Sequence, residues 1–444
     1  NDLETDNPNM DIRLLHASSS IVMAGKTKEE SIIQGHVGAA IKVLTPHQIA
    51  SIAFGTNGYE AMLLDIRGCD VVLDEIHTYT DVTRAIVLKI VEILQHLDCK
   101  IHLGTATMPS LLYNRIIELL GNENVLEVQL NEKELVLFNR HVVHKRDNWV
   151  SVNTIINEAV QTEKKVLIVC NRVRTAQEQY ISLIERYPNT PILLIHSRFK
   201  RSDRGEKECL LIGLDEKGES INKFNTSNNA CIVVSTQVVE VSLDISFDLM
   251  VTEAAPLDAL IQRFGRVNRK RSDVTIGRFK PVYVLSPPEE IKEALPYDLD
   301  IIKRSYAVLS DGEMLQENSL QEKIDQVFTE IDFLRIEQHS IFKETGSWNI
   351  DKLTHNPKAI LLDLLDIDSV SCICEADEQA YLETTIEQRT QMEISTRYYV
   401  VKDLRQLDCG SRPFIIPDSA YSKELGFETE KAKAGAYNPE YSFL

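Results

Sequence analysis

Short runs of β-branched and other apolar residues alternate along the chain with longer amphipathic stretches. The runs fall at residues 40–44, 69–73, 100–104, 165–170, 191–195, 231–235, 249–252 and 282–285. Between them, segments such as 82–97, 111–120 and 175–186 carry apolar residues at spacings of three and four, which predicts helices. Buried strands that alternate with helices are typical of a parallel sheet covered by helices. The pattern therefore predicts an α/β fold.

Two interruptions divide this pattern into three regions. Charged residues break the alternation at 131–149, and the pair Pro287-Pro288 ends a strand, because proline cannot continue a ladder of hydrogen bonds. Long helices are then expected at 297–310 and 320–337, before a mixed, acidic region. We expect two α/β lobes at residues 1–140 and 141–287, and a C-terminal accessory domain at 288–444.

The composition limits the classes of function. The fractions of apolar residues (43%) and charged residues (26%) are ordinary for a protein with a buried core. No apolar run is long enough to span a membrane, which makes the cytoplasm the expected location. Eight scattered cysteines without a C-x-x-C pair favour neither a zinc site nor a disulfide framework. The net charge of −19 excludes coating of nucleic acid by overall attraction, so any such ligand requires a local channel.

The apolar run at 69–73 leads into two adjacent acids, Asp74 and Glu75. Side chains at the carboxyl end of a buried parallel strand project into the crevice where ligands bind. Asp74 is suited to hold a nucleotide-bound Mg²⁺, largely through water, and Glu75 to orient and deprotonate the water that attacks the γ-phosphate. Solvated acids at a strand end are the alternative for this pair taken alone.

Two further segments complete an ordered set. Thr105 and Thr107 follow the next predicted strand, where hydroxyls can contact the acidic loop. Later, Gln262 to Arg269 (Q-R-F-G-R-V-N-R) is expected inside a helix, so that Arg266 and Arg269, three apart, share a face and converge on one phosphate. Such arginines raise the rate of phosphoryl transfer by roughly 10³–10⁵-fold. Surface ion pairing is the alternative for the arginines considered alone.

The segments T-P-H-Q (45–48), D-E-I-H (74–77), T-A-T (105–107), 235–244 and 262–269 together resemble a superfamily 2 DExH helicase. More narrowly, 74–79, H-S-R-F (196–199) and T-Q-V-V-E-V-S-L-D (236–244) resemble the helicase-nuclease that executes interference in type I CRISPR systems. The resemblance implies tandem RecA-like lobes, and a motor that uses ATP and Mg²⁺ to move 3′ to 5′ on single-stranded DNA. It also implies recruitment by an RNA-guided CRISPR surveillance complex.

By position, the resemblance assigns roles to individual residues. Those that serve the nucleotide and its metal ion would be Asp74, Glu75, Asp244, Gln262, Arg266 and Arg269. Those that couple nucleotide state to lobe movement would be His77, Thr105 and Thr107. Those that line the path of one DNA strand would be Thr45, Asn171, His196, Ser197, Arg198 and Thr236.

The sequence departs from this family in two respects. It contains no complete G-x-x-x-x-G-K-[ST] phosphate-binding loop; the nearest string, residues 20–27, has Ser20 in place of the first glycine. None of its eleven histidines is followed by aspartate, the metal-ligand pair of the family's nuclease. We therefore expect that lobe 1 is incomplete, that the chain alone hydrolyses ATP poorly, and that a nuclease domain lies upstream or in a separate chain. Two alternatives stay open: another DExH helicase acting on RNA or repair intermediates, and a truncated interaction module that does not hydrolyse ATP.

Overall fold

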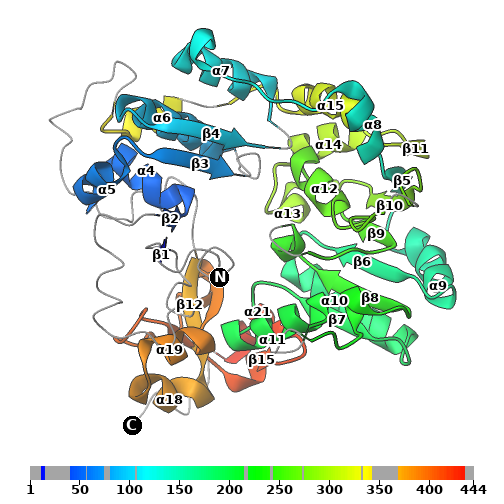
Figure 1. Cartoon of the computed structure of the whole chain (residues 1–444). Helices are drawn as coiled ribbons and strands as arrows, with labels where there is room; N and C mark the ends of the chain where they lie inside the picture. The colour runs from blue at the N-terminus through cyan, green and yellow to red at the C-terminus, as the bar shows by residue number, and fades with distance from the viewer. Residues whose placement is uncertain are drawn as a thin grey trace. The chain divides into compact units, whose positions relative to one another are not determined.

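Each of the eight predicted apolar runs forms a parallel strand, displaced by at most two residues. The computed structural model describes residues 12–15, 41–56, 58–74, 81–105, 108–214, 219–240, 244–272, 275–331, 334–342 and 369–435. The chain divides into unit 1 (Asn1–Glu127 and Thr329–Asp368) and unit 2 (Val128–Phe328 and Ser369–Leu444). Figure 1 labels most of the helices and strands of both units. The domain limits predicted from the sequence remain predictions.

Unit 1 contains two pairs of parallel strands, β1 with β2 and β3 with β4, in the part that the structure describes. Leu73 of β3 belongs to one core with Ile86, Ile90 and Leu94 of α6, and α4 and α7 complete this core. The later part of unit 1, described at residues 329–331 and 334–342, joins the same core through Ile336 and Phe342. An ion pair between Lys89 of α6 and Glu337 of α16 adds to this contact. The elements are β1 (Ile12–Leu15), β2 (Ile41–Leu44), α4 (Pro46–Phe54), α5 (Tyr59–Ile66), β3 (Asp70–Asp74), α6 (Asp81–His96), β4 (Lys100–Gly104), α7 (Ser110–Leu120) and α16 (Leu334–His339).

Unit 2 is built on a seven-stranded sheet of order β11-β5-β10-β9-β6-β8-β7, parallel except for β11. Its elements up to residue 328 are α8 (Glu132–Phe138), β5 (His141–Arg146), α9 (Asn153–Gln161), β6 (Lys165–Val169), α10 (Val173–Arg186), β7 (Ile192–Ile195), α11 (Arg201–Ile212), β8 (Cys231–Ser235), β9 (Leu249–Thr252), α12 (Leu257–Phe264), β10 (Lys280–Leu285), α13 (Ile291–Ala294), α14 (Leu299–Ala307), β11 (Glu313–Met314) and α15 (Leu320–Val327).

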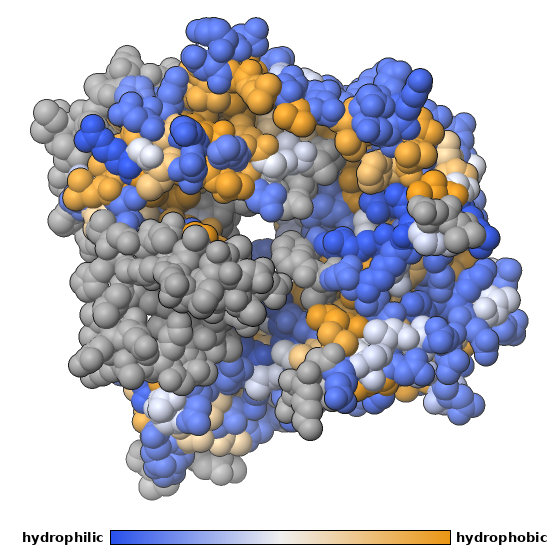
Figure 2. Space-filling model, in the orientation of Figure 1, coloured by the Kyte–Doolittle hydropathy of each residue, from blue (hydrophilic) through white to orange (hydrophobic). Residues whose placement is uncertain are grey.

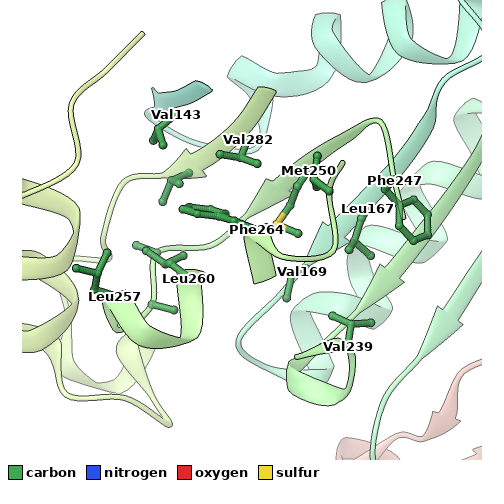
Figure 3. Packing of buried hydrophobic residues seen from close by; sticks show 14 of the residues in the cluster. Val143, Leu167, Val169, Val239, Phe247, Met250, Leu257, Leu260, Phe264 and Val282 are labelled. Atoms are coloured by element: carbon green, nitrogen blue, oxygen red, sulfur yellow. The ribbon is translucent and has the colours of Figure 1, made fainter. Parts of the chain in front are cut away.

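Helices cover both faces of this sheet. Side chains alternate between faces along a strand, and those of β6 divide accordingly: Val166 and Ile168 join a core with α9 and α10, while Leu167 and Val169 join a core with α12, α14 and α15. Figure 3 shows the second core, in which Phe264 of α12 lies among Met250, Val282 and Leu260. Continuous Val and Ile runs are expected for strands buried on both faces.

Residues 369–435 add a small sheet of order β13-β12-β14 and a hairpin, β15-β16. Phe427 of the hairpin packs in the core of the small sheet, while Leu425 packs against the core that contains α10. This part therefore belongs to unit 2. Its elements are β12 (Ser369–Cys374), α18 (Glu378–Glu383), α19 (Ile386–Met392), β13 (Ile394–Arg397), α20 (Tyr398–Val401), β14 (Phe414–Ile416), β15 (Tyr421–Ser422), β16 (Gly426–Phe427) and α21 (Thr429–Gly435).

Three expectations about individual elements need correction or completion. The predicted helix at 320–337 is interrupted, because α15 ends at Val327 and 328–331 are not helical. Strand β5 lies within 131–149, where only an interruption was expected. The helix expected to include residues 262–269 ends at Phe264. Among the described residues, no helix combines the length and the apolar composition that crossing a membrane requires.

Candidate functional site

Asp74 lies at the carboxyl end of β3, directly opposite Gly104 of the neighbouring strand β4. Its side chain is exposed, and a Cβ atom on Gly104 would lie 3.0 Å from the Asp74 Oδ1 atom. The glycine therefore leaves room for the carboxylate at the strand end. Thr105 follows Gly104 and is also exposed. The other sequence-predicted residues of this group, Glu75, His77 and Thr107, lie outside the described residues.

The exposed Asp74 carboxylate has the donor chemistry of a magnesium ligand, because Mg²⁺ commonly binds proteins through one or two carboxylates and keeps water and phosphate oxygens as its other ligands. A metal site built from several protein side chains would require a cluster of ligands. Among the described residues, no three or more His, Cys, Asp or Glu side chains gather to hold a metal ion. Of the acidic pair predicted for this site, Asp74 is the one that the structure describes, and its carboxylate could hold a nucleotide-bound ion.

In unit 2, the expectation that Arg266 and Arg269 share a helical face is wrong. Helix α12 ends at Phe264, and the chain then turns, with Asn268 in the left-handed region at φ 55°. Asparagine tolerates this conformation better than most residues. Gln262 lies in the last turn of α12 and is partly exposed. The two arginines are therefore placed by a turn.

The turn directs Arg266 and Arg269 to one segment, the loop after β8. Arg266 is buried and donates from Nε to the Val239 carbonyl (2.7 Å) and from Nη2 to the Glu240 carbonyl (2.6 Å). Arg269 donates from Nε to Asp244 Oδ1 at 3.1 Å. Burial opposes ionisation of Asp244, but Lys270 and Arg269 together hold its pKa below the usual value. The structure thus pairs the predicted residues Arg269 and Asp244, and it places Arg266 against an earlier part of the same loop, at Val239 and Glu240.

Sequence reasoning missed Arg263 as a site residue, although it is fully buried. Its guanidinium donates to Glu240 Oε1 (2.8 Å), Thr252 Oγ1 (2.9 Å), the Glu253 carbonyl (3.3 Å), Asn171 Oδ1 (3.0 Å) and Tyr297 Oη (3.2 Å). These partners come from loops after three sheet strands, from a strand end and from the segment before α14. Arg263 is therefore the hub of a buried polar network.

Burial and charge oppose each other in this network. Burial raises the pKa of Glu240 above its usual value, against the attraction of Arg263. Burial likewise disfavours the charge on Arg263, yet Glu240 raises the pKa of the guanidinium. Burial, followed by the Glu240 charge, raises the pKa of Tyr297 to about 12. The ion pair is the element that makes this burial tolerable.

Two residues predicted to line a DNA path are held inside unit 2. Asn171 donates from Nδ2 to the Ala254 carbonyl (2.8 Å), and its own carbonyl accepts from Gln237 Nε2 (2.9 Å). Thr236 is almost fully buried at the end of β8. In unit 1, Thr45 stands at the start of α4, where its backbone N–H donates to Gln48 Oε1 at 2.8 Å. The Asn171 side chain therefore holds local structure, the Thr236 side chain is buried, and Thr45 caps the start of α4.

His196 and its neighbours differ in exposure. The His196 ring is fully buried, with Nδ1 accepting from the Arg198 backbone N–H (3.1 Å) and Nε2 near the Leu425 carbonyl (3.0 Å). Burial lowers the pKa of His196 to about 3, so the ring is neutral and donates from Nε2. Ser197 is exposed and Arg198 is partly exposed. His196 therefore fastens the β15-β16 hairpin, while Ser197 and Arg198 are available for contact.

Comparisons with known proteins find similarity to CRISPR-associated nuclease/helicases. A family model described as "CRISPR-associated nuclease/helicase Cas3, C-terminal" matches residues 162–272. A putative CRISPR-associated nuclease/helicase Cas3 of Methanocaldococcus jannaschii is 33% identical over 267 residues, which cover 58% of this chain and 34% of that protein. The chain spans about a third of the length of the curated relatives it matches first.

Solved structures show the fold. The crystal structure of T. fusca Cas3-ATP matches with a TM-score of 0.70 and 18% identity, over 93% of this chain and 58% of that one. A structure described as "CRISPR RNA-guided surveillance complex, pre-nicking" contains a chain that matches with a TM-score of 0.65 and 18% identity, over 96% of this chain and 64% of that one. The predicted α/β fold with RecA-like lobes is thereby confirmed.

Proposed function

We propose that this chain, which is similar to CRISPR-associated nuclease/helicases of the Cas3 type, carries the motor part of an enzyme that moves 3′ to 5′ along single-stranded DNA, driven by ATP hydrolysis. The proposal includes recruitment by an RNA-guided surveillance complex, as the similarity to a chain of such a complex suggests. A nuclease domain, upstream or in a separate chain, would degrade the unwound strand.

The observation that supports this function best is that Arg266 and Arg269 both bond to the loop after β8, Arg266 at Val239 and Glu240 and Arg269 at Asp244. Guanidinium groups at the carboxyl end of a parallel strand can stabilise the charge that develops on a transferring phosphoryl group. Gln262 would contribute from the same segment. The solved relatives named for their complexes with ATP, AMPPNP and ADP support binding of a nucleotide.

In unit 1, Asp74 would hold the metal ion of the nucleotide and Glu75 would orient the attacking water. When bound, Mg²⁺ would neutralise charge on the phosphate oxygens. His77, Thr105 and Thr107 would couple the nucleotide to movement, and Ser197 and Arg198, with Thr45, would contact the DNA backbone. Contacts of this kind bind strands with little sequence preference.

ATP hydrolysis measured with and without single-stranded DNA tests the proposal. Two proteins are compared: this chain, and a version extended at its N-terminus to include a complete phosphate-binding loop. We expect hydrolysis by the extended form, stimulated by DNA and abolished by Glu75→Gln, and weak hydrolysis by the chain itself. Turnover by the short chain would mean that residues 20–27 bind phosphate after all.

Two results would overturn the proposal. Stimulation by RNA but not by DNA would favour a different DExH helicase. No hydrolysis by either form, together with retained binding of single strands, would favour an interaction module.

A further inference from the structure

Glu240 accepts hydrogen bonds from two nearby arginines, one at its side-chain carboxylate and one at its backbone carbonyl. Its carboxylate accepts from Arg263 Nε at 2.8 Å, and its backbone carbonyl accepts from Arg266 Nη2 at 2.6 Å. Arg266 Nε adds a bond of 2.7 Å to the carbonyl of the preceding residue, Val239. The position of the Arg266 guanidinium is therefore defined by the backbone at 239–240.

That backbone has two restraints. The Val239 side chain is fully buried in the core between the sheet and α12, as Figure 3 shows. The Glu240 side chain is fixed by Arg263, whose remaining donors are bound by Asn171, Thr252 and Tyr297. Because a fully buried guanidinium is costly without its carboxylate partner, the pair has little freedom to separate or rotate.

From these contacts we propose that Glu240 and Arg263 are positioning residues, whose ion pair fixes Arg266 through the 239–240 carbonyls. The consequence for catalysis rests on the proposed function, in which Arg266 contacts the phosphate. The geometric part, that Glu240 sets the place of Arg266, can be tested without any enzyme activity.

The first experiment is ¹⁵N NMR of the chain with labelled arginine, following the Nε–H signals of Arg263 and Arg266. Bonded, buried Nε–H groups exchange slowly with water. Glu240→Gln should accelerate exchange at both arginines by about tenfold, the factor expected for the loss of roughly one hydrogen bond. Arg263→Lys should have the same effect at Arg266, because it keeps the charge but removes the guanidinium fork.

The matched control is Asp248→Asn, which removes another ion pair of unit 2, with Lys280 at 2.6 Å. It should leave both Nε–H signals unchanged. If Glu240→Gln alters Arg263 but leaves Arg266 exchanging slowly, the positioning role is wrong. If either Glu240→Gln or Arg263→Lys fails to fold, the exchange rate of Arg266 in the other variant tests the positioning role.

The second experiment measures kcat and KM for ATP in the form that hydrolyses it. A misplaced catalytic group costs about 100-fold, so Glu240→Gln should lower kcat by that order and change KM by less than about threefold. In an Arg266→Ala background, the same change should have no further effect on kcat, because Glu240 acts through Arg266. Independent, additive losses would overturn the inference.

The two proposals fail in distinguishable ways. An unmodified protein that never hydrolyses ATP contradicts the proposed function, and the Nε–H signals still decide the placement of Arg266. An active enzyme whose Arg266 signal ignores Glu240 contradicts only the positioning role.

Discussion

The parallel strands of the two units have similar sequences but different burial. All five residues of β8 in unit 2 are buried, whereas β3 in unit 1 has one buried residue, Leu73. Val72 of β3 is 69% exposed, and Figure 2 shows hydrophobic side chains at the surface around the elements that Figure 1 labels α6 and α7. A β-branched run thus predicts a strand, but it does not reveal whether one face or both are covered.

The predicted site residues differ in the same way. Asp74 and Thr105 of unit 1 are exposed side chains at strand ends, while Asn171, Thr236 and Arg266 of unit 2 are buried. Buried polar groups must be paired: Asn171 accepts from Arg263, and Arg266 donates to the carbonyls of Val239 and Glu240. In unit 2, therefore, some motif residues build the scaffold that presents others, and a motif by itself does not distinguish these roles.

Among these predictions, the largest difference in the free energy of unfolding should come from the substitution Val→Ala made in β8 and in β3. Val233→Ala in β8 removes a fully buried side chain and should lower the free energy of unfolding by about 2–3 kcal/mol, from lost burial and the cavity. Val72→Ala in β3 should change it by less than about 0.5 kcal/mol. Hydrogen exchange followed by mass spectrometry gives the opening free energy of each strand separately. Equal losses would mean that the exposed face of β3 is covered in solution.

His196 should make the free energy of unfolding of unit 2 depend on pH, with a smaller effect than that of Val233→Ala. Its pKa is lowered by burial to about 3, so the unfolded chain binds a proton below about pH 6.5 while the folded chain does not. Stability is therefore complete above pH 6.5 and falls as the pH decreases. The loss should reach about 1.4 kcal/mol at pH 5.5.

His196→Gln should remove that loss, because glutamine does not titrate and can still donate to the Leu425 carbonyl. The measurement is denaturant unfolding at pH 7.5 and 5.5, and His141→Gln is a parallel case, since burial lowers the pKa of His141 to about 3 as well. A pH dependence that both variants leave unchanged would show that these rings are not buried in solution.

Strands were predictable where burial and apolar sequence coincide. All four residues of β9 are apolar or threonine and buried, and this strand has the bounds expected from its sequence. By contrast, β5 reads H-V-V-H-K-R, and its polar residues conceal a strand held by pairing with β10 and β11. Such a strand is specified by its neighbours more than by its own composition.

The site was predictable by residue type but not by contact. The arginines of 262–269 were identified, yet the end of α12 was missed, although Gly265 and Asn268 were available as signals of a turn. The burial of Arg263 has a weaker signal: it lies beside Phe264 and three residues after Leu260, both buried in the core. The distant partner Tyr297 could not be identified from the sequence, because long-range pairing has no local pattern.

The smallest effects should come from the same glycine-to-alanine substitution at two positions, which should stabilise the protein at only one of them. Gly205→Ala in unit 2 lies within α11, where an added Cβ meets no atom within 4 Å. It should stabilise the protein by about 0.5–1 kcal/mol, because glycine is a poor helix former. Gly104→Ala in unit 1 places a Cβ 3.0 Å from Asp74 Oδ1, so the carboxylate must move and no gain is expected.

Opening free energies of α11 and β4, obtained by hydrogen exchange, test both changes. If Gly104→Ala stabilises β4 as much as Gly205→Ala stabilises α11, Asp74 does not occupy the space beside Gly104. If Gly104→Ala gives no such gain, the proposed function makes a further prediction. Displacement of the Asp74 carboxylate should lower the rate of Mg²⁺-dependent ATP hydrolysis by the extended form. Gly205→Ala serves as the control there, because it changes stability in unit 2 without touching a proposed site residue.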